Sequence, residues 1–227
     1  MEITYRDVAK MIDHSLLNPT ITQAELDAGC QLAVAYDVAS VCIMPYSLKR
    51  CAEILHGSSV APSTTIGFPH GGHTTSIKVK EAEQALADGG KELDMVVNIS
   101  KVLSGDWGYV TDEIKAVVDV THAGGALVKV IFENAYLDDD MKIRLCQVCG
   151  DVGADWVKTS TGYAPSGATD ADLILMRKYA PAHVQVKAAG GVRTLERLLE
   201  VRALGVTRAG ATRTAEILDA FRARQAA

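Results

Sequence analysis

Short apolar runs, many of them rich in valine and isoleucine, alternate with longer segments of helical periodicity along the whole chain. Buried parallel strands are short continuous apolar runs in sequence. In the helices that connect them, apolar residues recur about every three or four positions, with polar residues between them. The runs that we predict as strands are residues 11–13, 39–44, 64–68, 93–97, 127–132, 156–158, 184–188 and 207–209. About eight strands separated by helices are typical of an α/β protein whose strands close into a TIM (β/α)8 barrel.

The segments between these strands carry readable helix ends. Thr22 and Glu25 have the spacing of a capping box, in which each side chain bonds the backbone amide of the other residue. We expect Ser76 to precede a helical run that ends at Gly89, and we expect glycines to follow three further helices, namely Gly124, Gly150 and Gly205. Because no linker interrupts the alternation, the sequence predicts a single-domain barrel over residues 1–227.

An open, doubly wound sheet is the competing topology. In its dinucleotide-binding form that fold carries a G-x-G-x-x-G turn after a strand, and this sequence contains no such turn. The number of predicted strands also favours the closed barrel.

Composition and charge narrow the possible partners. The chain is 48% hydrophobic and 22% charged, with a formal net charge of −5 and no block of lysine or arginine. This balance argues against nucleic acid or an acidic membrane as the main partner and leaves room for a small anionic substrate. No apolar run approaches the roughly 20 residues that span a bilayer, and the N-terminus lacks the basic-then-apolar order of a secretory signal. We therefore expect a cytoplasmic protein.

The cysteines agree with a reducing compartment. Five are scattered through apolar segments: Cys30, Cys42, Cys51, Cys146 and Cys149. The last two form a C-x-x-C, but they lie in a helical pattern and no second pair completes a tetrahedral zinc site. We interpret them as core residues and expect no metal.

Ionisable residues fall in the predicted strands, and barrel active sites gather at the carboxyl ends of strands. They are Asp13, Asp94, Lys129, Lys158 and Lys187, and Glu133 directly follows the fifth predicted strand. Charged groups in apolar strands avoid a large desolvation cost only if they are paired, so we expect them to face one another at the barrel mouth. A lysine beside a second cation and partly desolvated loses proton affinity, and its neutral amine is a nucleophile toward carbonyls. For Asp13 and Lys129 a buried structural ion pair is an equally good interpretation.

Glycine-rich segments follow the last two predicted strands. Gly190 and Gly191 come after the seventh, and Gly210 comes after the eighth. Barrels often bind phosphate there, because glycine lets backbone amides approach an anion at a helix N-terminus. Arg208 and Arg213 could add full positive charge, so the pattern predicts a phosphorylated substrate.

Seven segments along the chain carry a family resemblance: MIDHSLLNP, VCIMP, IGFPHG, ELDMVVN, LVKVIFE, VKTSTGY and VKAAGGVRT. In this order and spacing they resemble the motifs of the 2-deoxyribose-5-phosphate aldolases of the Schiff-base-forming class. The resemblance implies that Lys158 forms the Schiff base, that Lys187 perturbs it and that Asp94 is the acid/base partner. It implies Asp13 as a further active-site acid.

The resemblance also implies a substrate-binding set. The backbone at Gly190, Gly191 and Gly210, with Arg213, would hold the phosphate, and further substrate contacts would come from Thr159, Lys129 and Cys42. Where the family usually has a Gly-Thr-Ser-Ser-Gly turn, this chain reads Gly-Ala-Thr-Arg-Thr from residue 210 to residue 214. Loss of a glycine hinders the approach of backbone amides to the phosphate, whereas Arg213 adds a positive charge. We therefore expect the preference for phosphorylated over free sugar to be altered.

The implied reaction is the reversible cleavage of 2-deoxy-D-ribose 5-phosphate to D-glyceraldehyde 3-phosphate and acetaldehyde. The implied partners are phosphorylated sugars and short aldehydes, with no metal or other cofactor, and barrels of this kind often form homodimers. Two alternatives stay open from the residues: an aldolase or decarboxylating lyase for another short aldehyde, and a non-catalytic phosphate-binding barrel.

Overall fold

A computed structural model describes residues 3–226 and contains a closed barrel of parallel strands. Each strand pairs with its neighbours in sequence, and the first strand also pairs with the last. The strands are β1 Ile12–Leu16, β2 Ser40–Ile43, β3 Ala61–Ile66, β4 Glu92–Val96, β5 Leu127–Ile131, β6 Trp156–Lys158, β7 Gln185–Ala189 and β8 Arg208–Ala211. The predicted (β/α)8 barrel is confirmed, and the open sheet is wrong.

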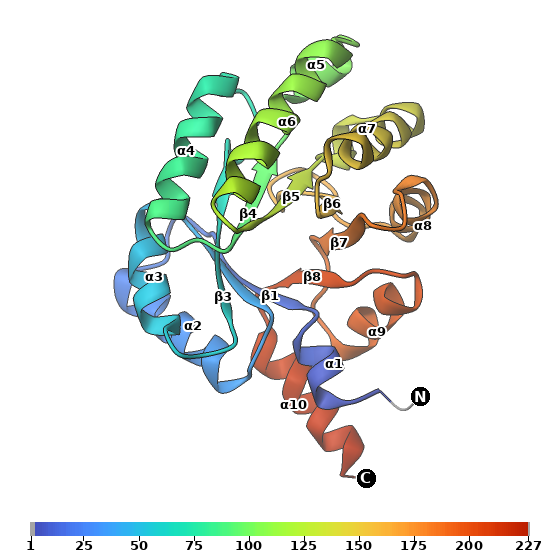
Figure 1. Cartoon of the computed structure of the whole chain (residues 1–227). Coiled ribbons are helices and arrows are strands. Elements are labelled where there is room, and N and C mark those ends of the chain that lie inside the picture. The colour runs from blue at the N-terminus through green and yellow to red at the C-terminus, as the bar shows by residue number, and fades with distance from the viewer. Residues whose placement is uncertain (1–2, 227) are drawn as a thin grey trace.

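Helices surround the barrel, and the two ends of the described chain lie on the same side of the molecule (Figure 1). The α-helices are α1 Tyr5–Ala9, α2 Gln23–Ala35, α3 Leu48–Leu55, α4 Thr75–Ala87, α5 Ile99–Leu103, α6 Trp107–Ala123, α7 Asp139–Val152, α8 Asp170–Tyr179, α9 Leu195–Ala203 and α10 Thr214–Gln225. Two short 3-10 turns, η1 Pro45–Ser47 and η2 Asn134–Tyr136, follow β2 and β5.

Most of the expected helix ends hold. Thr22 and Glu25 form the predicted capping box at the start of α2. The helix α4 begins at Thr75, so Ser76 lies inside its first turn. Gly150 also lies inside a helix, and α7 instead ends at Gly153, whose φ of 80° is the left-handed conformation that glycine adopts without strain.

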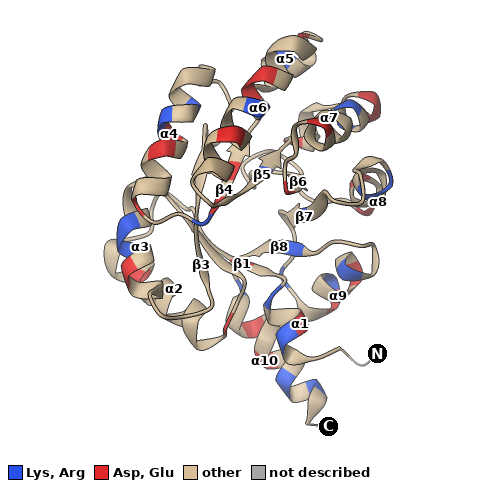
Figure 2. Cartoon of the chain, in the orientation of Figure 1, with Lys and Arg blue, Asp and Glu red and all other residues tan. Residues whose placement is uncertain are grey.

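Alternation along the strands separates two faces. Outward residues such as Ile12, Val41 and Val130 are buried under the helices. The inward residues are largely polar, and register pairs them across neighbouring strands: Asp13 with Ser40, Cys42 with Ser63, Thr65 with Asp94, and Lys158 with Lys187. Figure 2 shows acidic residues on β4 and a basic residue on β8, inside the ring of helices whose outer surfaces carry both charges. The barrel interior is therefore a polar core within an apolar shell.

The strands β1 and β8 both run further toward the C-terminus than predicted. Asp13 is the second residue of β1, which runs on to Leu16, so the expectation that it closes the strand is wrong. Gly210 lies within β8 and not in a turn after it. In both strands polar or small inward residues break the apolar run by which a buried strand is recognised.

His14 provides a test of the packing between β1 and α10. Its Nδ1 lies 2.8 Å from the hydroxyl of Thr214, the first residue of α10, and burial lowers its pKa to about 4. In the unfolded chain His14 takes up a proton near pH 6.5, whereas in the folded chain it stays neutral until about pH 4, so protonation favours unfolding. The contribution of neutral His14 to the free energy of unfolding is therefore present above about pH 6.5 and is lost as the pH falls toward about 4.

We expect the parent to lose about 2 kcal/mol of unfolding free energy from this group between about pH 7.5 and about pH 5. Urea unfolding at the two pH values measures it, with His14→Gln as the comparison. The variant should lack this part of the pH dependence, and an equal pH dependence in both proteins would contradict the assignment.

Candidate active site

The two lysines singled out in the sequence lie side by side inside the barrel. Lys158 is the last residue of β6, and its register partner on β7 is Lys187. Both ammonium groups contact the same oxygen, Oδ2 of Asp94 on β4, at 2.7 Å. The side chains of all three residues are at most 4% exposed, so the contacts are shielded from water.

A second set of charges lies next to this group. The Lys187 ammonium is 2.5 Å from Oδ2 of Asp13, and the Lys129 ammonium is 2.9 Å from Oδ1 of Asp94. Arg208 donates to Oδ1 of Asp13 at 2.7 Å and to both oxygens of Glu92 at 2.8 Å. Lys129 also contacts Glu92 at 2.6 Å. We call these seven residues the ion cluster: Asp13, Glu92, Asp94, Lys129, Lys158, Lys187 and Arg208.

The ion cluster contains three carboxylates and four basic groups. It is therefore neutral when one basic group gives up its proton. Burial, opposed by Asp94 and assisted by the neighbouring Lys187, lowers the pKa of Lys158. Burial also acts on Lys187, but Asp13 and Asp94 outweigh it and raise the pKa of that lysine. Lys158 is thus the group that is most readily neutral, and a neutral lysine is a nucleophile.

Asp94 is held as a carboxylate. Burial alone would raise its pKa, but Lys129, Lys158 and Lys187 together hold it well below its usual range. The same balance, with Lys187 as the largest favourable charge, lowers the pKa of Asp13. In this arrangement Lys158 and Lys187 are linked through one oxygen of the Asp94 carboxylate.

Two of the predicted substrate contacts are buried beside the cluster. Cys42 faces inward on β2, and burial raises the pKa of its thiol. The Thr159 hydroxyl donates to the Ala189 carbonyl at 3.1 Å and accepts from the Ala189 amide at 3.0 Å, which ties the ends of β6 and β7 together. Lys129 is fully enclosed by its carboxylate partners, so the ion-pair interpretation describes its contacts. Substrate binding by these three residues stays a prediction.

The two glycines after β7 form a turn with a left-handed backbone. Gly190 and Gly191 have φ of 82° and 95°, and a Cβ on Gly190 would lie 2.8 Å from the Cα of Gly167. A side chain at Gly190 would therefore strain the left-handed backbone at this residue and clash with the backbone of Gly167. Gly210 faces the interior, where a Cβ would lie 3.5 Å from Oγ of Ser15. Arg213 is exposed directly before α10.

Arg208 does not join this turn. Its guanidinium points into the barrel and pairs with Asp13 and Glu92, so the expectation that it supplies charge to a phosphate is wrong. Glu92 was missed in the sequence, although it lies two residues before Asp94 and period-two alternation puts both on one face.

Two cavities open at the carboxyl ends of the strands. The larger, about 790 Å³, is lined by residues that include Ser15, Asn18, Gly162, Tyr163 and Thr212. The smaller, about 290 Å³, is mostly apolar and is lined by Pro19, Met44, Pro45, Thr65, Phe68, Pro69, Glu81 and Tyr163. Ser15 and Thr65 are inward neighbours of Asp13 and Asp94, so both cavities lie next to the ion cluster.

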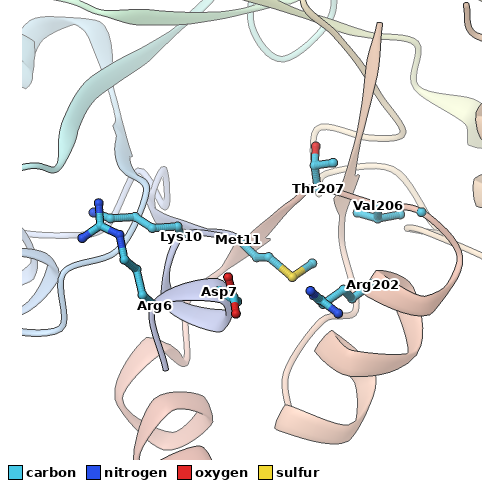
Figure 3. A pocket seen from close by; sticks show the side chains of 8 residues that line it. Arg6, Asp7, Lys10, Met11, Arg202, Val206 and Thr207 are labelled. Carbon is cyan, nitrogen blue, oxygen red and sulfur yellow. The ribbon is translucent and has the colours of Figure 1, made fainter. Parts of the chain in front are cut away.

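A further cavity of about 540 Å³ lies at the opposite end of the barrel, where Met11 and Thr207 precede β1 and β8 (Figure 3). Arg6, Asp7 and Arg202 also line it. In barrels of this class the active site is at the carboxyl end, so this cavity lies on the wrong face for the chemistry of Lys158.

Within residues 3–226, no group of three or more His, Cys, Asp or Glu side chains is arranged to hold a metal ion. Cys146 and Cys149 are buried free thiols in α7.

The family model of the DeoC/LacD family aldolases matches residues 7–216. The chain belongs to this family. A curated deoxyribose-phosphate aldolase of Rhodopirellula baltica is 65% identical to this DeoC/LacD-family chain over 218 residues, which is 96% of the chain and 90% of the relative. The resemblance to the Schiff-base aldolases read from the seven motifs is thus confirmed at the level of the family.

Solved structures of aldolases share the whole fold of this DeoC/LacD-family chain. An aldolase named QR15 superposes with a TM-score of 0.92 at 34% identity, covering 97% of the chain and 98% of that protein. A deoxyribose phosphate aldolase of Aeropyrum pernix, described as a unique tetramer, gives a TM-score of 0.89 at 28% identity, covering 97% and 93% of the two chains.

Proposed function

We propose that this chain is a deoxyribose-phosphate aldolase, which reversibly cleaves 2-deoxy-D-ribose 5-phosphate to D-glyceraldehyde 3-phosphate and acetaldehyde through a Schiff base on Lys158. The observation that carries the proposal is the charge balance of the ion cluster, which favours a neutral Lys158 at the carboxyl end of β6. The name carried by the relative of Rhodopirellula baltica supplies the substrate.

The first step is the attack of Lys158 on the open-chain aldehyde. Its neutral nitrogen adds to C1, and loss of water gives an iminium whose positive charge lies beside the Asp94 carboxylate. The carboxylate is already ionised and fixed by three lysines, so it stabilises this charge without reorganising.

The iminium then draws the electrons of the C2–C3 bond as the C3 hydroxyl passes its proton to a water in the site. Glyceraldehyde 3-phosphate leaves, and an enamine of acetaldehyde stays on Lys158. Protonation of its carbon by Lys187, relayed over the Asp94 carboxylate or a water, regenerates an iminium that water hydrolyses. The Asp13 carboxylate lies 2.5 Å from the Lys187 ammonium and keeps it protonated. This is the role that we propose for Asp13 as the supporting acid.

Borohydride reduction in the presence of acetaldehyde or 2-deoxyribose 5-phosphate tests the proposal directly. We expect a covalent adduct, located by peptide mapping on Lys158, together with release of glyceraldehyde 3-phosphate in a coupled assay. Adduct formation without cleavage of the sugar phosphate would favour an aldolase for another aldehyde. Absence of any adduct would favour the non-catalytic phosphate-binding barrel.

Arg213 gives a prediction for the phosphate end of the substrate. Because Arg213 is exposed and directly follows Thr212, which lines the larger cavity, Arg213→Ala should raise KM for the phosphorylated sugar about fivefold to tenfold and leave kcat nearly unchanged. Steady-state kinetics with 2-deoxyribose 5-phosphate and with unphosphorylated 2-deoxyribose measures it. Arg224→Ala, an exposed arginine in the last turn of α10, is the control. Equal losses with both sugars would contradict phosphate binding.

The remaining expectations stay predictions. We propose that residues 1–227 act as one catalytic barrel domain in the cytoplasm, and that the chain assembles as a homodimer. No helix within residues 3–226 is long and apolar enough to cross a membrane.

A further inference from the structure

We propose that Glu133 is a positioning residue that fixes the rim of the substrate cavity through a hydrogen-bonded relay from Thr161 to Tyr163 and Leu17. The inference rests on the proposed function and assigns a residue outside the ion cluster to it. The relay starts after β5, passes through the loop after β6 and ends after β1.

The backbone at Glu133 is itself unusual. It has φ of 59° and ψ of 63°, the left-handed conformation that a residue with a Cβ adopts only at a cost in free energy. The chain on either side is anchored to the strand that ends in Lys158, because the Phe132 amide donates to the Lys158 carbonyl at 3.0 Å and the Asn134 amide donates to the Thr159 carbonyl at 2.9 Å. This conformation turns the Glu133 side chain toward the loop after β6.

Glu133 is 2% exposed, and its carboxylate is satisfied without a cation. The Thr161 amide donates to its two oxygens at 3.2 and 3.3 Å, and the Thr161 hydroxyl donates to Oε2. In the part of the chain that the structure describes, no lysine, arginine or histidine nitrogen forms an ion pair with this carboxylate. Burying a carboxylate costs free energy, and this carboxylate is held by Thr161 alone. The contact therefore indicates that the position of the loop after β6 is important.

Thr161 passes this constraint to Tyr163. Its Oγ1 accepts from the Tyr163 amide at 3.0 Å, and the Tyr163 hydroxyl donates to the Leu17 carbonyl at 2.7 Å. The Tyr163 ring meets Phe68 edge to face, with centroids 5.6 Å apart. Tyr163 is thus fixed at its amide, its ring and its hydroxyl, although half of it is exposed.

The fixed ring separates the two cavities at the barrel mouth. Tyr163 lines both the cavity of about 790 Å³, with Ser15 and Thr212, and the mostly apolar cavity of about 290 Å³, with Phe68 and Met44. A sugar phosphate suits the larger cavity, because Ser15, Asn18 and Thr212, whose side chains form hydrogen bonds, line it. The relay should therefore set the affinity for the whole sugar phosphate and leave the chemistry of a small aldehyde at Lys158 unaffected.

Two variants of Glu133 separate the carboxylate from the backbone. Glu133→Gln keeps the size of the side chain, and Glu133→Gly keeps the left-handed backbone at no strain. Both should raise KM for 2-deoxyribose 5-phosphate about tenfold, which corresponds to about 1.4 kcal/mol, with kcat within about twofold of the parent. The rate of borohydride trapping with acetaldehyde alone should match that of the parent, a result that a general loss of structure would not give.

Tyr163→Phe removes the bond to Leu17 and gives the second arm. If the relay acts as a unit, Glu133→Gln should have at most about a third of its effect on KM when it is added to Tyr163→Phe. Tyr136→Phe is the matched control, because that tyrosine is 50% exposed against 51% for Tyr163 and lies in the loop after β5. It should change nothing.

An unchanged KM in both Glu133 variants, a parallel loss of acetaldehyde trapping, or full additivity with Tyr163→Phe would each overturn the inference while the parent still cleaves the sugar phosphate. A parent that traps acetaldehyde but does not cleave 2-deoxyribose 5-phosphate would overturn the proposed function, and the inference with it.

Discussion

Replacing Lys158 with alanine is expected to lower the cleavage of 2-deoxyribose 5-phosphate by about 10⁴-fold or more, because the covalent intermediate can no longer form. No other lysine of the ion cluster can substitute. Asp13 and Asp94 raise the pKa of Lys187 against the effect of burial, and Lys129 is enclosed by Glu92 and Asp94.

The same variant should stay folded. Without Lys158, three cations face three carboxylates and the ion cluster is neutral, so no buried charge is left without a partner. Urea unfolding should therefore give a midpoint near that of the parent while the coupled assay and borohydride trapping both fail. Lys115→Ala on the outer surface of α6 is the control and should be fully active. Turnover above about one per cent in Lys158→Ala would refute the role of this lysine.

Lys187→Met should lower the activity near neutral pH by about 100-fold or more through its effect on Lys158. Removal of Lys187 leaves three carboxylates that only Lys129, Arg208 and a protonated Lys158 can balance. The pKa of Lys158 should therefore rise, and a rise of about two units reduces its neutral fraction about 100-fold. The loss of the proton donor adds to this effect.

The pH dependence distinguishes this explanation from simple damage. In the parent, the rate of borohydride trapping with acetaldehyde should rise with pH through the lowered pKa of Lys158 and then level off. In Lys187→Met the rise should move to higher pH, so that alkaline conditions restore much of the trapping. A variant whose trapping rate is low at every pH would show that Lys187 does not act through the protonation of Lys158.

The arrangement of strands was largely predictable, because outward residues of a parallel barrel are buried under helices and read as apolar runs. The strand of Trp156–Lys158 was predicted to the residue. Strand ends were less predictable where inward residues are polar. His14 and Ser15 in β1 resemble a loop in sequence, yet β1 continues through them because its inward face lies over the ion cluster.

The predicted acids and lysines were brought together, but their partners were harder to anticipate. Arg208 reads as a surface charge near a glycine and is instead a buried partner of Asp13 and Glu92. Which cation meets which carboxylate depends on register around a closed barrel, and that is a property of the whole chain. The sequence marks Glu133 only as an acid directly after the fifth predicted strand, because its role lies in a left-handed backbone and in one buried loop residue.

Arg208 on the last strand completes the partners of Asp13 on the first strand and of Glu92 on the fourth. A seven-stranded intermediate without β8 would hold two carboxylates in a half-formed interior without their guanidinium. Such a state keeps three lysines against three carboxylates, so its charges balance only with Lys158 protonated, and its sheet edges stay open. Docking of β8 brings the fourth cation, so the step that seals the barrel also gives the ion cluster the charge balance that favours a neutral Lys158.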